Sequence, residues 1–129
     1  MTQEYKQLLL KDLSARLPYG VKVKTPYNDA ELIGIVKRKG FKKDVDYIDA
    51  VTNKETYPIR YVQPYLRPLS SMTEEEYTEY VRLVHEGYAH DTVDYLNSIH
   101  VDYRGLIPKG LALEVTKENN PYKKWKFVG

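Results

Sequence analysis

The three histidines are the side chains of this chain best suited to acid–base or metal chemistry near neutral pH. They stand at positions 85, 90 and 100, spacings of five and ten residues. Side chains share a helix face when they are three or four residues apart, so these spacings do not gather the histidines. A metal site would need acids such as Glu86 or Asp102 brought close by the tertiary fold. We therefore expect no metal and no cofactor.

Nucleophiles and acids are present, but their neighbours do not suit catalysis. Serines stand at positions 14, 70, 71 and 98, outside any nucleophile-elbow context. Glu74, Glu75 and Glu76 begin a predicted helix, where consecutive carboxylates are usually solvated partners of the helix dipole. No glycine pattern fits a phosphate loop or a dinucleotide site. The sequence predicts a protein that is not an enzyme, with an unrecognised small enzyme as the least favoured interpretation.

Basic side chains are concentrated around one predicted hairpin. Single-stranded nucleic acid is often held by such a surface, where phosphates pair with lysines and bases stack on aromatic rings. Lysine-rich turns are also common as solvated hairpins, and charged strands protect sheet edges. Nucleic-acid binding through residues 37–43 is thus one interpretation. The candidate residues are Lys37, Arg38, Lys39, Phe41, Lys42 and Lys43.

Tyrosine is unusually abundant, with 13 residues against two Phe and one Trp. Tyr57, Tyr61 and Tyr65 recur every fourth residue, close to two prolines. Tyrosine combines a large ring with a polar hydroxyl group, which suits both contact surfaces and partly solvated cores. The three rings are therefore candidates for binding an extended partner protein. Alternatively, they pack the sheet against the helices that follow.

Charge is segregated along the chain although the net charge is only +2. Residues 20–67 hold ten Lys or Arg against six acids, residues 68–99 one against seven, and residues 100–129 six against three. Such asymmetry creates a cationic patch and an acidic one. Self-association, with the acidic helix of one copy against the basic hairpin of another, is a further interpretation.

Length and composition predict one domain over residues 1–116 and a mobile basic tail over residues 117–129. The chain has 129 residues, 42% of them apolar, and no cysteine. No apolar run approaches the ~20 residues that span a bilayer, and the first residues do not resemble a signal peptide. We expect a cytoplasmic protein that does not bind a membrane.

The predicted fold class is α+β, beginning with an N-terminal helix over residues 3–16. Leucines at three-four spacing form its apolar stripe, while Asp12 and Arg16 fall mostly opposite with the exposed lysines. Thr2 can cap its start, and Leu17-Pro18 ends it.

Short strands are predicted between about residues 21 and 62, at 21–25, 30–37, 45–51 and 56–60. Gly34 suggests a bulge or a close approach, and Pro58 suggests an edge strand. Close spacing favours a small curled antiparallel sheet or an SH3-like barrel, with a flat meander as the alternative. The segment from residue 61 to 68 is expected to be an extended or single-turn exit.

Two helices, over about residues 73–86 and 91–101, are predicted to pack on that sheet. Capping boxes fit in two registers, Ser71 with Glu74 or Thr73 with Glu76, and Gly87 is a natural stop. The apolar stripe of the first helix comprises Tyr77, Tyr80, Val81, Val84 and Tyr88. Residues 111–115 are expected to form a last strand.

Several segments resemble a group of short proteins encoded by gut anaerobes and their bacteriophages. They are Leu8–Leu13, Arg16–Val21, Pro64–Glu76 and Asp102–Ile107, of which Pro-Tyr-Leu-Arg-Pro is the most specific. The resemblance implies an accessory protein of a bacterial genome or mobile element, and it implies no activity or binding residues. Together with the absence of a catalytic pattern, it favours a non-enzymatic protein that binds a partner protein, with nucleic-acid binding as the alternative.

Overall fold

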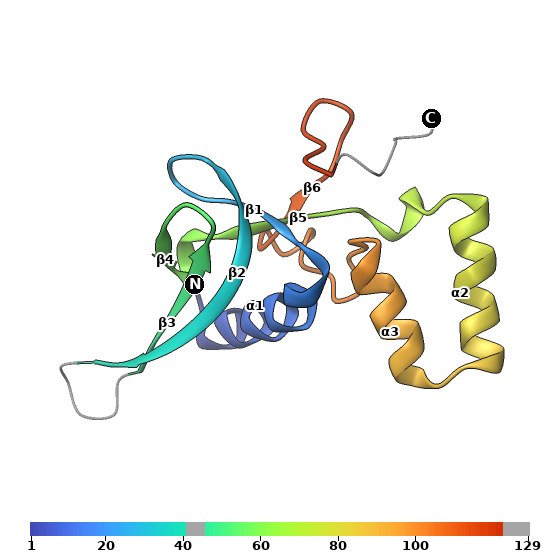
Figure 1. Ribbon diagram of the computed structural model, residues 1–129, viewed down its shortest axis with the longest axis horizontal. Coiled ribbons are helices and arrows are strands. Elements are labelled where there is room, and N and C mark those ends of the chain that lie inside the picture. Colours follow the sequence, from blue (N-terminus) through green and yellow to red (C-terminus); the bar gives the residue numbers. More distant parts are fainter. Residues whose placement is uncertain (41–45, 123–129) are drawn as a thin grey trace. The chain divides into compact units, whose positions relative to one another are not determined.

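The computed structural model describes residues 1–40 and 46–122 and has an α+β fold, as predicted (Figure 1). The chain forms two compact units, Met1–Pro64 and Tyr65–Gly129. The first contains one α-helix and most of the strands. The second contains two α-helices and the last strand. The strand β5 (Gln63–Leu66) crosses from one unit to the next.

Helix α1 (Gln3–Arg16) has the predicted ends. The Thr2 hydroxyl accepts a hydrogen bond from the Tyr5 amide at 3.1 Å, which satisfies a free donor of the first turn. The helix passes into a 3-10 turn over Leu17–Tyr19, and Gly20 follows with φ of 70°, a left-handed conformation that glycine adopts without strain. Local sequence signals therefore located both ends of this helix correctly.

The predicted exposure of Asp12 and Arg16 is wrong. Both side chains are 0% exposed, and Arg16 Nε donates to Asp12 Oδ2 at 2.8 Å. The two residues are four apart, so they share the buried helix face with Leu9 and Leu13. The apolar pattern could not reveal this, because it treats every charged residue as exposed whether or not it has a partner.

The strands of the first unit pair in antiparallel fashion. They are β1 (Lys22–Lys24), β2 (Asp29–Lys39), β3 (Asp46–Thr52) and β4 (Thr56–Pro58), and they lie in the order β4-β3-β2-β1, after which β5 pairs with β1. The predicted bulge is confirmed, because Leu32 pairs with Thr52 while Gly34 pairs with Val51, which leaves Ile33 as the extra residue. The predicted edge position of Pro58 is also confirmed, since β4 ends the row.

The described strands form an open sheet and not a closed barrel, so the SH3-like barrel, one of the two predicted forms, is not confirmed. Reading along the pairs, β4 lies at one end and β6 (Leu113–Glu114) at the other, and the two do not pair. The sheet is also mixed, because β6 runs parallel to β5. The predicted strand over residues 56–60 ends at Pro58, and a 3-10 turn (Ile59–Tyr61) follows it. The predicted exit segment, residues 61–68, contains β5, a strand that sequence analysis missed. Pro64 is tolerated in this strand because β6 pairs only with Tyr65 and Leu66.

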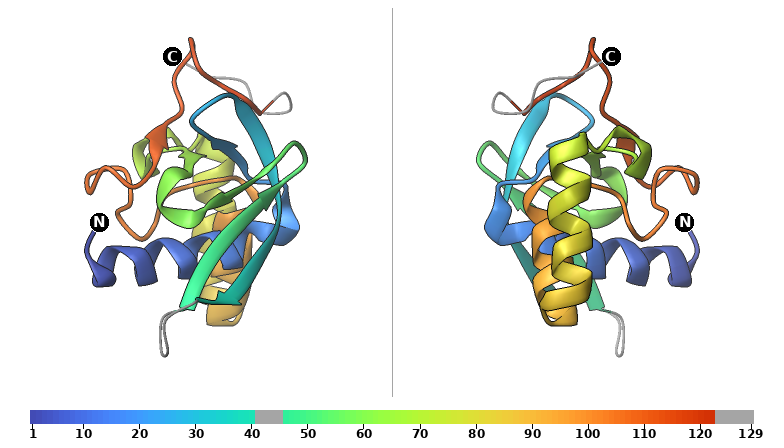
Figure 2. Two further views of the ribbon diagram at one scale, coloured as in Figure 1. Left: turned by 90° about the vertical axis from the view of Figure 1, so that its left-hand side faces the viewer. Right: turned by 90° about the vertical axis from the view of Figure 1, so that its right-hand side faces the viewer.

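The second unit contains a 3-10 turn (Leu69–Ser71), helix α2 (Glu74–Glu86) and helix α3 (Ala89–Ser98). The capping box uses the second of the two predicted registers, Thr73 with Glu76. Gly87 ends α2 as expected, because its backbone is extended, and a Cβ atom there would lie 2.9 Å from the Leu83 carbonyl oxygen, which favours glycine at this position. Helices α2 and α3 lie side by side (Figures 1 and 2).

Aromatic side chains form a small core in the second unit. Tyr65, Val115 and Tyr122 are buried together, with Leu113 against them. The Tyr122 hydroxyl donates to the Tyr65 carbonyl at 2.6 Å, and its ring stacks on His100 at 3.8 Å between centroids. Tyr122 thus ties residues beyond β6 to β5. Among the helices in the described ranges, α1 is the longest with 14 residues, and none has the length and apolar character that crossing a bilayer requires.

The buried ion pair of α1 leads to a stability prediction. We expect Asp12→Ala to lower the free energy of unfolding by about 3 kcal/mol, because it leaves the buried Arg16 guanidinium without its counter-charge. Urea denaturation followed by circular dichroism measures the change. Lys11→Ala, one residue away and exposed, is the control and should alter it by less than about 0.5 kcal/mol. Equal effects of the two substitutions would contradict the structural role of the pair.

Candidate functional site

The predicted basic residues lie at the end of β2. Lys37, Arg38 and Lys39 are exposed and pair in register with the first residues of β3. Successive strand residues point to opposite faces, so Lys37 and Lys39 share one face and Arg38 lies on the other. Arg38 Nε donates to Asp49 Oδ2 at 2.6 Å. Phe41, Lys42 and Lys43 lie outside the described residues.

The three predicted tyrosines do not form one exposed surface. Tyr57 and Tyr65 are buried, whereas Tyr61 is half exposed and lies beside Arg60, whose guanidinium carbon is 4.6 Å from the ring centroid. The Tyr57 hydroxyl donates to Glu55 at 2.6 Å, and this hydrogen bond raises the pKa of Tyr57. Of the two interpretations of these residues, packing therefore describes Tyr57 and Tyr65 better.

Helix α2 instead exposes the apolar stripe that was expected to be covered. None of the residues Glu74–Glu86, all of them described, is buried. Tyr77 is 59% exposed, Val84 52%, and Tyr88, just beyond the helix, 75%. Tyr77, the half-buried Val81 and Val84 lie at three-four spacing in one row along the helix, and Tyr80 of the predicted stripe is half-buried beside them. Tyr88 follows Gly87 in extended backbone beyond the end of the helix. We call Tyr77, Val81, Val84 and Tyr88 the α2 seam.

The neighbouring helix α3 faces a different side of α2. Burial raises the pKa of Tyr95 in α3, and the nearby charges of Glu76 and Glu79 raise it further. Those two glutamates are therefore near the side of α2 that faces α3. Since Glu76 precedes Tyr77 in the helix, the two side chains point in clearly different directions. The seam is thus left without a covering element among the described residues.

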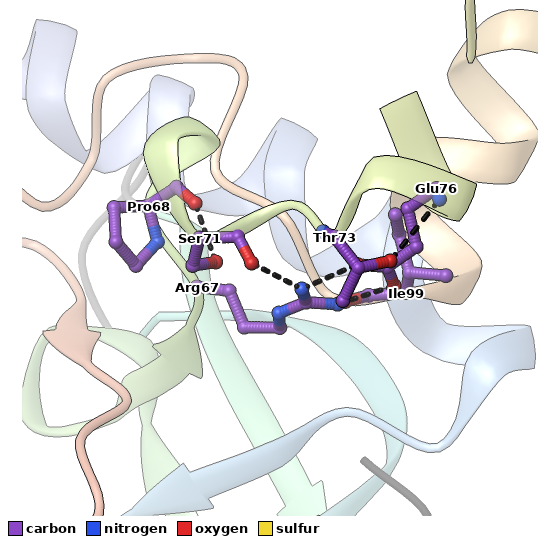
Figure 3. Close-up of polar contacts among 6 residues, drawn as sticks. All are labelled: Arg67, Pro68, Ser71, Thr73, Glu76 and Ile99. Atoms are coloured by element: carbon purple, nitrogen blue, oxygen red, sulfur yellow. Dashed lines mark hydrogen bonds and ion pairs between the residues drawn. The ribbon is translucent and has the colours of Figure 1, made fainter. Parts of the chain in front are cut away.

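The start of α2 is fixed by Arg67, which follows β5 (Figure 3). Its guanidinium is fully buried and forms a two-pronged ion pair with Glu76, at 2.8 Å from Nη1 to Oε2 and 2.7 Å from Nη2 to Oε1. The same group donates to the carbonyls of Ile99, at 3.1 Å, and Ser71, at 3.0 Å. One side chain therefore joins the first turn of α2, the end of α3 and the turn between β5 and α2.

Glu76 has two roles in this arrangement. Oε1 also accepts a hydrogen bond from the Thr73 amide at 2.9 Å, completing the capping box. Burial by itself would raise the pKa of Glu76, but the hydrogen bonds from Arg67 and Thr73 outweigh it and hold this pKa below its ordinary value. Glu76 therefore remains an anion in the folded protein at neutral pH.

The helix that carries the seam has a net negative charge, with five glutamates and one arginine. That arginine, Arg82, is paired with Glu79 at 2.6 Å and with Glu86 at 3.6 Å, and Glu76 is paired with Arg67. The glutamates without an ion pair among the described residues, Glu74 and Glu75, lie in the first turn of the helix.

The described residues contain no group of three or more His, Asp or Glu arranged to hold a metal ion. No protein-family model, curated protein or solved structure matches the chain.

Sequence analysis did not single out Arg67, although it lies in the Pro-Tyr-Leu-Arg-Pro segment. A usable signal was present, because this arginine directly follows two residues, Tyr65 and Leu66, that read as apolar and buried. An arginine in such a position is rarely buried without a carboxylate partner. The sequence did not show that the partner is Glu76, nine residues away, because this depends on the path of the chain between the two residues.

The Arg67–Glu76 pair predicts both a stability loss and a change in pH dependence. We expect Glu76→Gln to lower the free energy of unfolding by about 3 kcal/mol at neutral pH, because the buried guanidinium loses its counter-charge. Since the folded pKa of Glu76 lies below its ordinary value of 4.5, its contribution is present above that pH and is lost as the pH falls through the folded pKa.

Urea denaturation of wild type and variant from about pH 6 to about pH 3 tests this expectation. The stability difference between Glu76→Gln and wild type should shrink as the pH falls. Glu75→Gln removes an exposed carboxylate from the same helical turn and is the matched control. A constant difference across the pH range would show that the charge of Glu76 does not stabilise the fold.

Proposed function

We propose that this protein is a non-enzymatic accessory protein that binds a partner protein through the α2 seam. The exposure of Tyr77 and Val84 in one row of α2, with the exposed Tyr88 just beyond the end of the helix, carries the proposal. Scattered apolar residues are normal on protein surfaces, but a contiguous row on one helix marks an interaction surface. Tyrosine is also enriched where proteins recognise one another. The expected accessory role and cytoplasmic location belong to the same proposal.

The spacing of the seam favours a helical partner. Within α2, the seam residues Tyr77, Val81 and Val84 lie at intervals of four and three residues, at which two packed helices interdigitate their side chains. A partner helix with its own apolar row would bury both rows against each other. The start of α2 is already held by Arg67 and Glu76, so this surface loses little conformational freedom on binding.

Charge favours a basic partner. The helix that carries the seam holds five glutamates against one paired arginine, and α3 adds Asp91 and Asp94. Such a surface attracts a cationic segment and repels both acidic proteins and nucleic-acid phosphates. The occupant that fits best is therefore a basic amphipathic helix of another protein.

Two synthetic helical peptides with the same apolar heptad row, one lysine-rich and one glutamate-rich, provide a direct test by isothermal titration calorimetry. We expect the lysine-rich peptide to bind and the glutamate-rich peptide not to bind. Replacing both Tyr77 and Val84 by Ala should weaken binding at least tenfold, because the exposed apolar contacts are removed.

Thr78→Ala changes an exposed, uncharged residue of the same helix outside the seam and is the control, expected to keep binding within about threefold of wild type. Circular dichroism confirms that each variant is folded. Binding of both peptides with equal affinity would contradict the proposal. Light scattering of the protein alone tests for self-association. If the wild type is a dimer and the double variant Tyr77→Ala, Val84→Ala is a monomer, the occupant of the seam is a second copy of this chain.

Nucleic-acid binding is the second candidate, supported by the shared face of Lys37 and Lys39 on β2. It predicts a salt-sensitive mobility shift of a single-stranded oligonucleotide, since lysine–phosphate contacts release counterions. Lys37→Glu combined with Lys39→Glu should abolish that shift, while Lys24→Glu, an exposed lysine of β1, should leave most of it. A wild-type protein that gives no shift at low salt would exclude this function.

A further inference from the structure

A cleft of about 370 Å³ lies within the first unit, apart from the α2 seam. Three segments line it: the beginning of α1, the paired strands β2 and β3, and the residues from the end of β4 into the following 3-10 turn. Its volume is in the range of small-molecule sites. Each of the three segments contributes one cationic side chain.

The cations of the cleft exceed its anions. Lys6 comes from α1, Arg38 from β2 and Arg60 from the 3-10 turn, while Asp49 is the one carboxylate among the described lining residues. Arg38 is paired with Asp49 at 2.6 Å. Lys6 forms no ion pair with any described residue, and the recorded contacts of Arg60 are with the uncharged Tyr61. Among the described residues, two positive charges of the cleft therefore lack a counter-charge.

Asp49 indicates a second property of a ligand for this cleft, namely a hydrogen-bond donor. Its side chain is only 8% exposed, and Oδ2 accepts the hydrogen bond from Arg38. Oδ1 is buried and has no hydrogen-bond partner in the part of the chain that is described. A buried carboxylate oxygen without a donor is costly, so a ligand that donates a hydrogen bond to it would gain affinity.

The remaining walls are mainly apolar. Tyr47 offers a half-exposed ring, and Ile48, Pro58 and Ile59 lie beside it. Small-molecule sites commonly combine such walls with a few convergent polar groups.

We propose that this cleft binds a small phosphorylated molecule that also carries a hydroxyl group. A carboxylate ligand would be satisfied by one arginine, whereas a dianionic phosphate has three terminal oxygens and suits several cations from different directions. Its phosphate lies between Lys6 and Arg60, and its hydroxyl donates to Oδ1 of Asp49. The apolar walls contact the carbon skeleton. This site is independent of the proposed protein-binding function.

Ribose 5-phosphate is the probe, with inorganic phosphate and ribose as comparators, in calorimetric titrations of the full chain at low salt. We expect ribose 5-phosphate to bind about tenfold more tightly than inorganic phosphate, because only the former can place a hydroxyl at Asp49 while its phosphate lies between Lys6 and Arg60. Ribose should not bind detectably. Lys6→Ala and Arg60→Ala should each weaken ribose 5-phosphate binding about tenfold.

Two further variants are controls, one outside the cleft and one at Asp49. Lys11→Ala removes an exposed lysine of the same helix outside the cleft and should leave the affinity unchanged. Asp49→Asn removes a negative charge. If charge alone governs binding, this variant should bind both ribose 5-phosphate and inorganic phosphate more tightly. If the proposed hydrogen bond forms, the variant should bind the two ligands with similar affinity. Equal losses for Lys11→Ala and Lys6→Ala, or no binding by wild type at millimolar ligand, would overturn the proposal.

Discussion

The buried guanidinium of Arg67 is the interaction on which the second unit depends. A charge removed from water is tolerated only when a counter-charge and hydrogen-bond acceptors surround it. Glu76 provides the counter-charge, and the Ser71 and Ile99 carbonyls are further acceptors. The Arg67 backbone also bonds to residues on either side of Val101, through the His100 carbonyl and the Asp102 amide, each at 2.8 Å. The strand, the turn and both helices must therefore adopt one arrangement to satisfy one side chain.

This polar anchoring explains how α2 can be held in place while its apolar row stays exposed. A surface helix normally gains its stability by burying its apolar face. In α2, the capping box and the ion pair to Arg67 fix the first turn, and the helix ends at Gly87, whose backbone is extended. The apolar seam is then available for a partner, which is why exposure here supports a binding function.

The first unit uses buried charge in a related way. Asp12 and Arg16 pair within one helix, and Asp49 pairs with Arg38 across two strands. The first pair is fully enclosed, whereas in the second pair Arg38 is exposed and both residues line a cleft. The second pair therefore borders the proposed ligand site.

The sequence by itself determined the features that depend on neighbours along the chain. Thr2 and Thr73 located helix starts, Gly87 a helix end, Gly34 a bulge and Pro58 an edge strand, because caps, turns and missing amide donors act within a few residues. The tertiary structure alone decided that the sheet is open and mixed, that one apolar row stays exposed, and which charges are buried. Each of these depends on partners distant in the sequence, and apolar periodicity contains no information about where those partners lie.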